Sequence, residues 1–289
     1  MTTLSRAVAV LGVGLIDPQA PVVHADDLGF TRGDGCFEAT RVVTSPSGEH
    51  QVDHLEEHFD RFDLSCAGLD LPPIDRPGWR DLIDQLLAGW TVAGESMLRL
   101  LLSRGRESRL EAGVTGVATL TSIAPETLRQ RREGIDVITL RRGYTADAFA
   151  GAHWLLGGVK TLSYAVNMAG VREAKRRGAH DVIFVDGESR LLEAPTATVL
   201  WLAGGVLNTV PVDGTGVLNS ITQRALFAAA AQAGYRTGHL SGTAADLLAS
   251  DGGWLVSSGR GVAQLLSLDG VPMPGQPELT AELSKLAGF

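Results

Sequence analysis

The chain of 289 residues carries a formal net charge of −8 at pH 7, and 44% of its residues are hydrophobic. This length allows two domains with a large buried core. The acidic balance disfavours nucleic acid or an acidic membrane surface as the principal partner. Two cysteines, Cys36 and Cys66, cannot build a disulfide framework. Cys66 falls on the apolar face of a predicted helix, so its expected role is core packing.

The first apolar run, residues 7–16, follows Arg6 and has some features of a signal peptide. A buried strand accounts for a run of this length equally well, and Asp17-Pro18 ends it. We therefore expect the first strand of a cytoplasmic enzyme. No run approaches the ~20 apolar residues that a membrane helix requires.

Further along, short apolar runs at 97–103, 117–120 and 135–140 alternate with helical stretches near 53–69 and 78–89, which indicates α/β organisation. A polar stretch with a proline, residues 122–132, is the predicted linker between an N-terminal domain (1–121) and a C-terminal domain (133–289). The second half predicts a helix at 161–177 and strands at 181–185, 190–193, 198–202 and 206–210. Consecutive hairpins with Asp186-Gly187 and Gly204-Gly205 turns favour a mixed sheet.

Lysine chemistry has few candidates, because the chain contains only Lys160, Lys175 and Lys285. Lys175 lies in a charged helix end, and Lys285 lies near the terminus. Lys160 follows the apolar, glycine-bearing stretch 154–159, which would desolvate its ammonium and lower its pKa. Lys160 is therefore the candidate for covalent chemistry with a carbonyl cofactor.

Pyridoxal phosphate needs a carboxylate at its pyridine nitrogen and hydrogen-bond donors for its phosphate, besides the amine. Glu193 follows two leucines on a predicted strand, where an acid needs a cationic partner such as a pyridinium. Ser220, Ile221 and Thr222 open the predicted helix 223–233, and the amides at a helix start attract anions. Ser220 and Thr222 also suit ordinary helix N-caps.

Nearly the whole chain resembles the class IV (fold type IV) pyridoxal phosphate enzymes. The segment Gly33-Asp-Gly-Cys-Phe-Glu38 is similar to the N-terminal strand motif of the family. The segment from His54 to Arg61 is similar to its His-x-x-Arg helix, and the remaining motifs follow in family order. The resemblance implies a two-domain α/β fold of the D-amino acid aminotransferase type, with mixed sheets, an active site between the domains and a homodimer.

The resemblance also implies a role for each of seven residues at the cofactor. They are Lys160 as the Schiff-base lysine, Glu193 as the partner of the pyridine nitrogen, Arg61, Thr222 and Ser258 as phosphate ligands, Ile221 beside Thr222 at the helix start, and Tyr164 near the phenolic oxygen. Three positions depart from the family pattern: Thr198, Ser220 and Gln223 replace a usual asparagine, glycine and arginine. None of these departures removes a group that the core chemistry requires.

Within the family, Ser103-Arg104-Gly105 and the Gly-Asp-Gly-Cys-Phe motif most resemble the 4-amino-4-deoxychorismate lyases, which release pyruvate and 4-aminobenzoate for folate. The alternative is a class IV aminotransferase acting on branched-chain amino acids, D-amino acids or (R)-amines. Either substrate would be a small anionic amine, and arginine recognises carboxylates through two parallel donors. We expect Arg104, Gly259 and Arg260 to contact it.

Two other segments partly match known site motifs. The pattern from His54 to His58 also matches the His-x-x-Glu-His motif of zinc hydrolases, although zinc needs a third protein ligand and no distinctive acidic helix follows. Gly12-Val-Gly14 begins a dinucleotide fingerprint, but Asp17 stands where its third glycine belongs. We therefore expect pyridoxal phosphate and no metal. A binding protein without catalysis would require Lys160 and Glu193 to be incidental.

Overall fold

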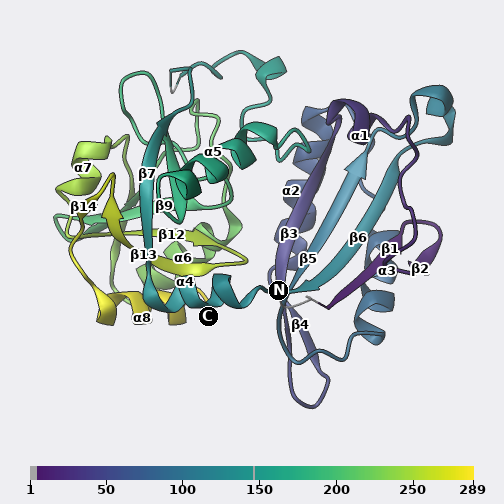
Figure 1. The fold of residues 1–289 in the computed structure, drawn as a ribbon, viewed down its shortest axis with the longest axis horizontal. Helices are drawn as coiled ribbons and strands as arrows, with labels where there is room; N and C mark the ends of the chain where they lie inside the picture. Colours follow the sequence, from purple (N-terminus) through teal and green to yellow (C-terminus); the bar gives the residue numbers. More distant parts are fainter. Residues whose placement is uncertain (1–4, 146) are drawn as a thin grey trace. The chain divides into compact units, whose positions relative to one another are not determined.

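The structure is a computed structural model that describes residues 5–145 and 147–289. The chain divides into two compact units (Figure 1). The first unit comprises the residues up to Ala124 together with Val159–Tyr164, and the second comprises Pro125–Gly158 with Ala165–Phe289. The short segment that carries Lys160 is thus part of the first unit.

In its described part, the first unit consists of a six-stranded antiparallel sheet in the order β2-β1-β6-β5-β3-β4. Helices α2 and α3 cover one face of it (Figure 1). The elements are β1 (Arg6–Val10), β2 (Gly14–Ile16), α1 (Leu28–Arg32), β3 (Gly35–Thr44), β4 (His50–Val52), α2 (Leu55–Gly68), α3 (Arg76–Ala88), β5 (Gly94–Ser103), the 3-10 helix η1 (Glu107–Ala112) and β6 (Thr115–Ser122).

Helix α2 packs on β3 through the apolar face that its sequence predicts. Phe59, Phe62 and Cys66 recur at helical spacing, and all three are fully buried. From β3, Cys36 and Val42 join the same core, because alternate residues of a strand face one side of the sheet. Glu38 lies between them in this alternation, so an acid is placed under the helix.

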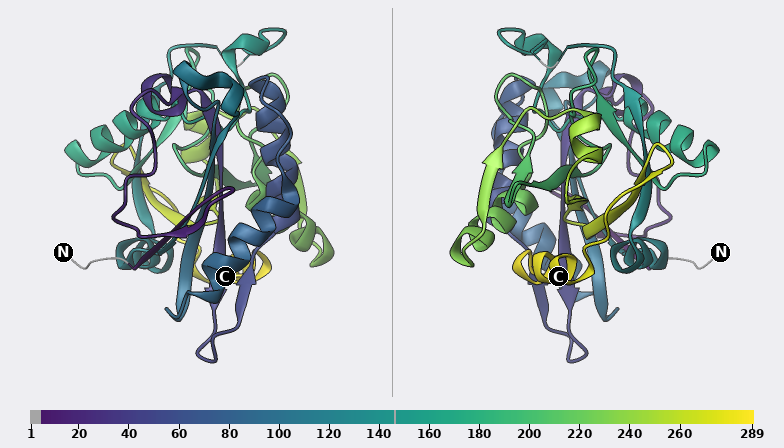
Figure 2. Two further views of the ribbon diagram at one scale, coloured as in Figure 1. Left: turned by 90° about the vertical axis from the view of Figure 1, so that its right-hand side faces the viewer. Right: turned by 90° about the vertical axis from the view of Figure 1, so that its left-hand side faces the viewer.

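The second unit contains a mixed eight-stranded sheet in its described part, in the order β11-β10-β9-β12-β13-β7-β8 with β14 beside β13. The yellow C-terminal helix α8 packs on β13 and α6 (Figure 2). The elements are α4 (Pro125–Glu133), β7 (Ile135–Arg141), the 3-10 helix η2 (His153–Leu155), α5 (Ala165–Arg176), β8 (Asp181–Val185), β9 (Thr198–Ala203), β10 (Val206–Thr209), α6 (Ile221–Gln232), β11 (Arg236–His239), α7 (Ala244–Leu248), β12 (Gly252–Ser257), β13 (Gly261–Leu268), β14 (Val271–Pro272) and α8 (Pro277–Leu286).

The predicted α/β fold with mixed sheets is confirmed. In the second sheet β13, β7 and β8 run parallel, whereas β10, β9, β12 and β13 follow one another antiparallel. The predicted strand 181–185 coincides with β8. Over the predicted strand 190–193 the structure has only isolated bridges, Val185 with Leu191 and Arg190 with Thr243. Backbone hydrogen bonds still join Leu192 N to Phe184 O and Phe184 N to Glu193 O, each at 2.9 Å, so residues 190–193 pair with β8 without forming a regular strand.

Two segments differ from their sequence-based descriptions. The polar stretch predicted as a linker forms most of α4, where Arg129 bridges Glu126 and Glu133 at 2.7 and 3.0 Å. Its polarity is that of a solvated helix with i,i+4 pairs. Residues 160–164 are not helical, since α5 begins only at Ala165. Instead the chain bonds to β3, with Leu162 N donating to Gly35 O at 2.8 Å.

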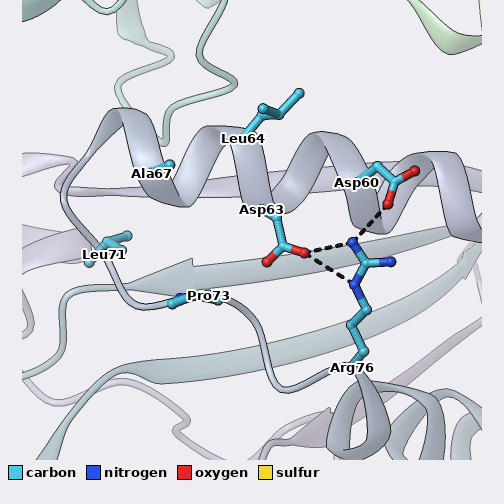
Figure 3. Close-up of a pocket in the computed structure, with 7 residues that line it drawn as sticks. All are labelled: Asp60, Asp63, Leu64, Ala67, Leu71, Pro73 and Arg76. Carbon is cyan, nitrogen blue, oxygen red and sulfur yellow. Dashed lines mark hydrogen bonds and ion pairs between the residues drawn. The ribbon is translucent and has the colours of Figure 1, made fainter.

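A groove of about 520 Å³ lies between α2 and the segment that leads into α3 (Figure 3). Arg76 spans it and forms ion pairs of 2.7 Å with Asp60 and Asp63. None of the residues predicted to bind cofactor or substrate lines this groove. Across the described residues, no helix is both long and apolar enough to cross a membrane.

Candidate active site

The motif that opens β3 needs its two glycines for different reasons. Gly33 ends α1 in the left-handed conformation, with φ of 71°, which costs glycine no side-chain clash. At Gly35 an added Cβ would lie 2.3 Å from Leu102 O and 2.7 Å from the Leu162 side chain. The second glycine therefore allows the segment 160–164 to lie directly against the start of β3.

Lys160 is fixed by its backbone on both sides. Its amide N donates to Ser65 Oγ of α2 at 3.3 Å, and its carbonyl O accepts from Phe37 N of β3 at 2.9 Å. Its Nζ lies 4.3 Å from the centre of the Phe37 ring and 5.7 Å from that of Tyr164. These rings meet edge to face at 5.3 Å. The ammonium is thus half-buried over aromatic faces, which attract a cation while limiting its hydration.

Arg61 belongs to a buried cluster that the sequence analysis did not foresee. Its Nε and Nη2 donate to the two carboxylate oxygens of Glu38, each at 2.7 Å. His58 Nδ1 lies 2.6 Å from Glu38 Oε2, and it must donate because an ionised carboxylate only accepts. Only 1% of Glu38 and of His58 is exposed, and 8% of Arg61. The bidentate pair fixes the plane and position of the Arg61 guanidinium.

Burial and partners act against each other in this cluster. Burial alone would raise the pKa of Glu38, but the hydrogen bonds and charge of Arg61, with the His58 hydrogen bond, hold that pKa at about 2. Burial lowers the pKa of His58 below its ordinary value of 6.5. The cluster therefore consists of one anion, one cation and a neutral imidazole near neutral pH.

The two histidines of the alternative zinc motif have other partners. His58 is committed to Glu38, and His54 precedes α2 in a left-handed conformation with Nδ1 3.8 Å from Glu57 Oε1. Across residues 5–145 and 147–289, no three His, Cys, Asp or Glu side chains group as metal ligands. The sequence pattern is produced by a helix that carries Arg61 on its buried face.

In the second unit, Glu193 follows the bridge between Val185 and Leu191. Its backbone O accepts from Phe184 N at 2.9 Å, and its carboxylate Oε2 accepts from Leu218 N at 3.1 Å. Leu218 lies on the approach to α6, so the acid is tied to the helix start. This hydrogen bond fixes the orientation of the Glu193 carboxylate.

Three further residues lie near the segment that carries Glu193. Asn167 of α5 donates from Nδ2 to Pro195 O at 3.0 Å and accepts from Arg142 Nη1 at 2.9 Å. Burial raises the pKa of Tyr144, and the charge of Glu193 adds to this effect while Arg142 opposes it. Nothing in the sequence indicates that the partners of Asn167 are Arg142 and the segment after Glu193.

The helix start predicted to hold phosphate is formed by Ser220 and α6. Ser220 Oγ accepts from Gln223 N at 3.3 Å, so this serine is the N-cap, and α6 begins at Ile221. Thr222 Oγ1 and Ser258 Oγ lie 3.0 Å apart although 36 residues separate them. Two hydroxyls beside the first turn of a twelve-residue helix suit a phosphate.

The predicted substrate arginines already have carboxylate partners within their own units. Arg104 pairs with Asp34, from Nε to Oδ2 at 2.7 Å, and Nη2 also donates to Leu69 O at 2.6 Å. Arg260 pairs with buried Asp181 at 2.8 Å. The carbonyl O of Gly259 accepts from Arg131 Nη2 at 3.2 Å. A substrate carboxylate would have to share these guanidinium groups.

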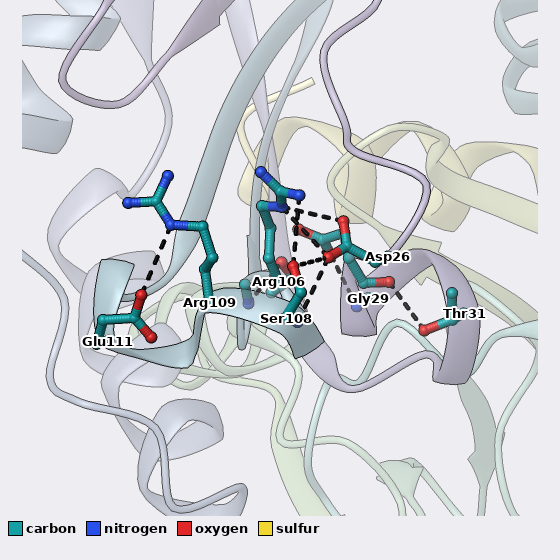
Figure 4. A network of polar contacts seen from close by, with 10 residues as sticks. Asp26, Gly29, Thr31, Arg106, Ser108, Arg109 and Glu111 are labelled. Atoms are coloured by element: carbon teal, nitrogen blue, oxygen red, sulfur yellow. Dashed lines mark hydrogen bonds and ion pairs between the residues drawn. The ribbon is translucent and has the colours of Figure 1, made fainter.

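Arg109, in the loop that follows Arg104, is the more accessible arginine. Asp26 anchors η1 by accepting from Arg106 Nε at 3.0 Å and from the Ser108 hydroxyl (Figure 4). These two hydrogen bonds, that of Ser108 first, lower the pKa of Asp26. Arg109 Nε lies 3.6 Å from Glu111 Oε1, and 63% of the Arg109 side chain is exposed. The anchored loop therefore presents Arg109 outward from unit 1.

The model of the family described as amino-transferase class IV matches residues 35–268, so the chain belongs to this family. Its members are pyridoxal phosphate-dependent enzymes, and the cofactor of this chain is pyridoxal phosphate. The chain is an enzyme that acts either as a lyase or as an aminotransferase.

Among proteins of known sequence, the chain is 37% identical over 286 residues to a bifunctional aminodeoxychorismate lyase and D-amino acid transaminase from Mycobacterium tuberculosis, covering 96% of both chains. Among solved structures, it is similar to a hypothetical aminotransferase from the same organism in its pyridoxal phosphate-bound form, with a TM-score of 0.90, 38% identity and 98% of both chains covered. A fold IV transaminase from Curtobacterium pusillum gives a TM-score of 0.90 at 37% identity, covering 99% of this chain and 100% of that one.

The residues of the chain fit this cofactor. Lys160 would supply an amine that lies over two aromatic rings, and Glu193 would supply a carboxylate oriented by a backbone amide. Thr222 and Ser258 would supply paired hydroxyls at the start of α6. These are the three kinds of group that pyridoxal phosphate requires of a protein.

Proposed function

We propose that the protein is a 4-amino-4-deoxychorismate lyase, which releases pyruvate and 4-aminobenzoate. The observation that carries the proposal is the 37% identity, over 96% of both chains, to a protein named as a bifunctional aminodeoxychorismate lyase and D-amino acid transaminase. The Ser103-Arg104-Gly105 strand end and the Gly33-to-Glu38 motif, which resemble those of such lyases, support it from the sequence.

Bound pyridoxal phosphate supplies an electron sink for bonds at the carbon that bears the substrate amine. In this proposal Lys160 anchors the cofactor and then acts through Nζ as the group that removes the proton from that carbon. The Phe37 and Tyr164 rings orient Nζ and limit its hydration. Glu193 keeps a proton on the pyridine nitrogen, and Thr222 and Ser258 hold the phosphate, with Arg61 as a further ligand.

The substrate carries two carboxylates, so at least one arginine should bind it. Arg104 is the predicted ligand, but it also ties Asp34 and Leu69 to the strand end. Replacing it therefore removes structural contacts along with any substrate contact. Arg109→Ala is the matched comparison, because this exposed arginine lies in the same loop with one partner at 3.6 Å. Replacing the arginine that binds the substrate carboxylate should raise KM about tenfold or more.

The decisive measurement is turnover of aminodeoxychorismate by the purified holoenzyme without any oxo acid. A lyase regenerates its cofactor in each cycle, so pyruvate and 4-aminobenzoate should form in equal amounts well beyond one equivalent of enzyme. An aminotransferase stops after one turnover without an acceptor. Product limited to one equivalent would contradict the lyase proposal.

A second function is favoured by the same relative, whose printed name includes D-amino acid transaminase. We propose testing amino transfer from D-alanine to 2-oxoglutarate beside transfer from L-leucine and an (R)-amine. Amino transfer from D-alanine together with acceptor-free cleavage of aminodeoxychorismate would assign both activities to one site. Brisk transfer without acceptor-free product would leave the aminotransferase alternative, with Lys160 and Glu193 in unchanged roles.

Assembly and cellular context stay predictions of the family resemblance. We propose a homodimer in the cytoplasm that contributes 4-aminobenzoate to folate synthesis. Sedimentation of the holoenzyme would test the assembly directly. Growth of a strain lacking this gene, with and without added 4-aminobenzoate, would test the contribution to folate.

A further inference from the structure

The two cysteines of the chain form a buried pair. Cys36 lies on β3 and Cys66 on α2, thirty positions apart, and their Sγ atoms are 3.6 Å from each other. Neither residue has any exposed surface, and both are free thiols. Core packing explains their burial, but it does not require two sulfurs to be neighbours across a strand and a helix.

Their contact makes the two thiols unequal. Either thiol can donate in this contact, and the contact with Cys36 lowers the pKa of Cys66 against the opposing effect of burial. The same contact, with burial, raises the pKa of Cys36. Cys66 is therefore the better nucleophile, because the thiolate is the reactive form, and Cys36 retains its proton as the second thiol.

We infer that Cys36 and Cys66 form a reversible oxidation site, which a hydroperoxide converts to a disulfide. The Cys66 sulfur attacks one peroxide oxygen, the O–O bond breaks, and the other oxygen leaves as hydroxide or water. The Cys36 sulfur then displaces the oxygen from the resulting sulfenic acid, and a second water leaves. Two thiols and one hydrogen peroxide thus give one disulfide and two waters.

The distances fit a pair poised to close. A disulfide has a sulfur–sulfur bond of about 2.05 Å, so the two Sγ atoms must approach by roughly 1.5 Å from their present contact. Closing the bond therefore requires rotation about the Cα–Cβ bonds or a small movement of α2 on β3. Because no sulfur surface is exposed, the oxidant must be as small as hydrogen peroxide, and bulky disulfides should react far more slowly.

The site adjoins both anchors of Lys160. Residue 37, next to Cys36, donates its amide to Lys160 O at 2.9 Å, and Ser65, next to Cys66, accepts from Lys160 N at 3.3 Å. Cys36 itself forms an isolated β-bridge with Thr161. Formation of the disulfide would draw together the positions of β3 and α2 that hold the Lys160 backbone. A displacement of ~1 Å at a reacting group can cost up to a hundredfold in rate.

The test begins with the reduced holoenzyme in hydrogen peroxide, followed by unfolding in a maleimide and mass analysis without reductant. We expect monomer about 2 Da lighter that takes up no maleimide, and a peptide pair linking Cys36 to Cys66, all reversed by dithiothreitol. Two maleimides on every chain would overturn the inference. So would sulfinic acid on either cysteine without the linked peptides. These masses do not depend on which reaction the enzyme catalyses.

A second measurement tests the effect on Lys160. The visible absorption of the cofactor and turnover with any accepted substrate should change on oxidation, with turnover falling about tenfold. Reductant should restore both. Cys66→Ala, compared with its own untreated sample, should keep its turnover in the same peroxide. If the disulfide forms while absorption and turnover stay constant, the oxidation site stands and its coupling to Lys160 is overturned.

Discussion

The two units hold their predicted cofactor residues by different physical means. In the first unit, Arg61 is locked by Glu38 in a buried ion pair with His58 beside it, and Lys160 is held by two backbone hydrogen bonds. In the second, Glu193 accepts a hydrogen bond from a backbone amide, and Thr222 and Ser258 are joined by a hydrogen bond between hydroxyls. Among these predicted cofactor residues, a buried charge pair holds Arg61, whereas neutral donors contact those of the second unit.

This difference separates stability from binding. A buried charge whose partner is removed destabilises the fold by several kcal/mol. A hydroxyl that loses a neutral hydrogen bond costs on the order of 1 kcal/mol. Substitutions in the buried charge cluster of Glu38, His58 and Arg61 should therefore alter the fold together with the chemistry. Substitutions of Lys160, or of the predicted cofactor residues in the second unit, should alter the chemistry with little change in stability.

The largest effect is expected for Lys160→Ala. Removing the amine should abolish covalent attachment of the cofactor and lower turnover by at least about a thousandfold. The visible absorption of the bound cofactor should be lost, while the unfolding midpoint of the cofactor-free protein changes little because both backbone bonds remain. Lys175→Ala, at the end of α5, is the control and should keep colour and activity. Reduction with borohydride and peptide mapping should label residue 160, and a label elsewhere would refute the assignment.

The next largest effect is a loss of stability in Arg61→Ala. The substitution removes the cationic partner of buried Glu38 and leaves it with His58 and the Ala39 amide, which should cost about 3–5 kcal/mol in the free energy of unfolding. Arg76→Ala is the control, because its ion pairs with Asp60 and Asp63 are more exposed and worth about 1 kcal/mol at most. Urea unfolding of both variants without cofactor measures the difference. Equal losses in the two variants would contradict the special cost of the buried charge cluster.

Acid should remove the stability that Glu38 contributes. Its pKa is 4.5 in the unfolded chain and about 2 when folded, a difference of roughly 2.5 units or about 3 kcal/mol. A depressed carboxyl pKa stabilises the fold above pH 4.5, and this contribution falls away as the pH drops towards 2. The lowered pKa of His58 acts in the same direction below pH 6.5. Urea unfolding between pH 7 and 3 should show the loss, with a shallower slope in Glu38→Gln. Parallel slopes would contradict it.

Glu193→Gln should lower turnover about a hundredfold, since a neutral amide does not keep the proton that makes the pyridine ring an electron sink. The cofactor should remain bound and the unfolding midpoint nearly constant, as expected for the second unit. Glu188→Gln, on an exposed turn, is the matched control. Near-normal turnover in Glu193→Gln would refute its role.

The smallest effect is expected for Ser258→Ala. Losing one neutral phosphate donor should weaken cofactor binding about fivefold, or ~1 kcal/mol, and loss of the bond to Thr222 should lower the free energy of unfolding by about 1 kcal/mol at most. Its neighbour Ser257, whose Oγ accepts from Arg260 N at 3.3 Å, provides the control substitution. Titration of the cofactor-free variants with pyridoxal phosphate gives the two affinities. A large loss of stability in Ser258→Ala would break the comparison.

Local chemistry made parts of this structure predictable from sequence. The apolar spacing of Phe59, Phe62 and Cys66 predicts the buried face of α2, and Ser220 marks the start of α6 within two residues. The short apolar run at 181–185 predicts strand β8, and all five of its residues are buried. Each of these features depends on neighbours within a few positions, so a single segment contains the whole signal.

Long-range pairing could not be predicted in the same way. Residues 160–164 have a helical composition, yet they extend along β3 because Gly35 leaves room for Leu162. Arg61 pairs with Glu38, which lies 23 residues away, and nothing in the sequence of either segment indicates this contact. Likewise the polarity of residues 125–133 suits a linker and a solvated helix equally. The family resemblance identified the motifs, and their contacts required the structure.

The six residues from Val159 to Tyr164 give the molecule an unusual relation between chain and fold. The polypeptide leaves the first unit after Ala124 and returns to it for this segment alone. A gene fragment ending at residue 124 would encode the sheet and both covering helices but would omit Lys160, the predicted Schiff-base lysine. It would also leave the start of β3 without its bonds to Lys160 and Leu162. No single cut in the sequence therefore separates a complete first unit from the second.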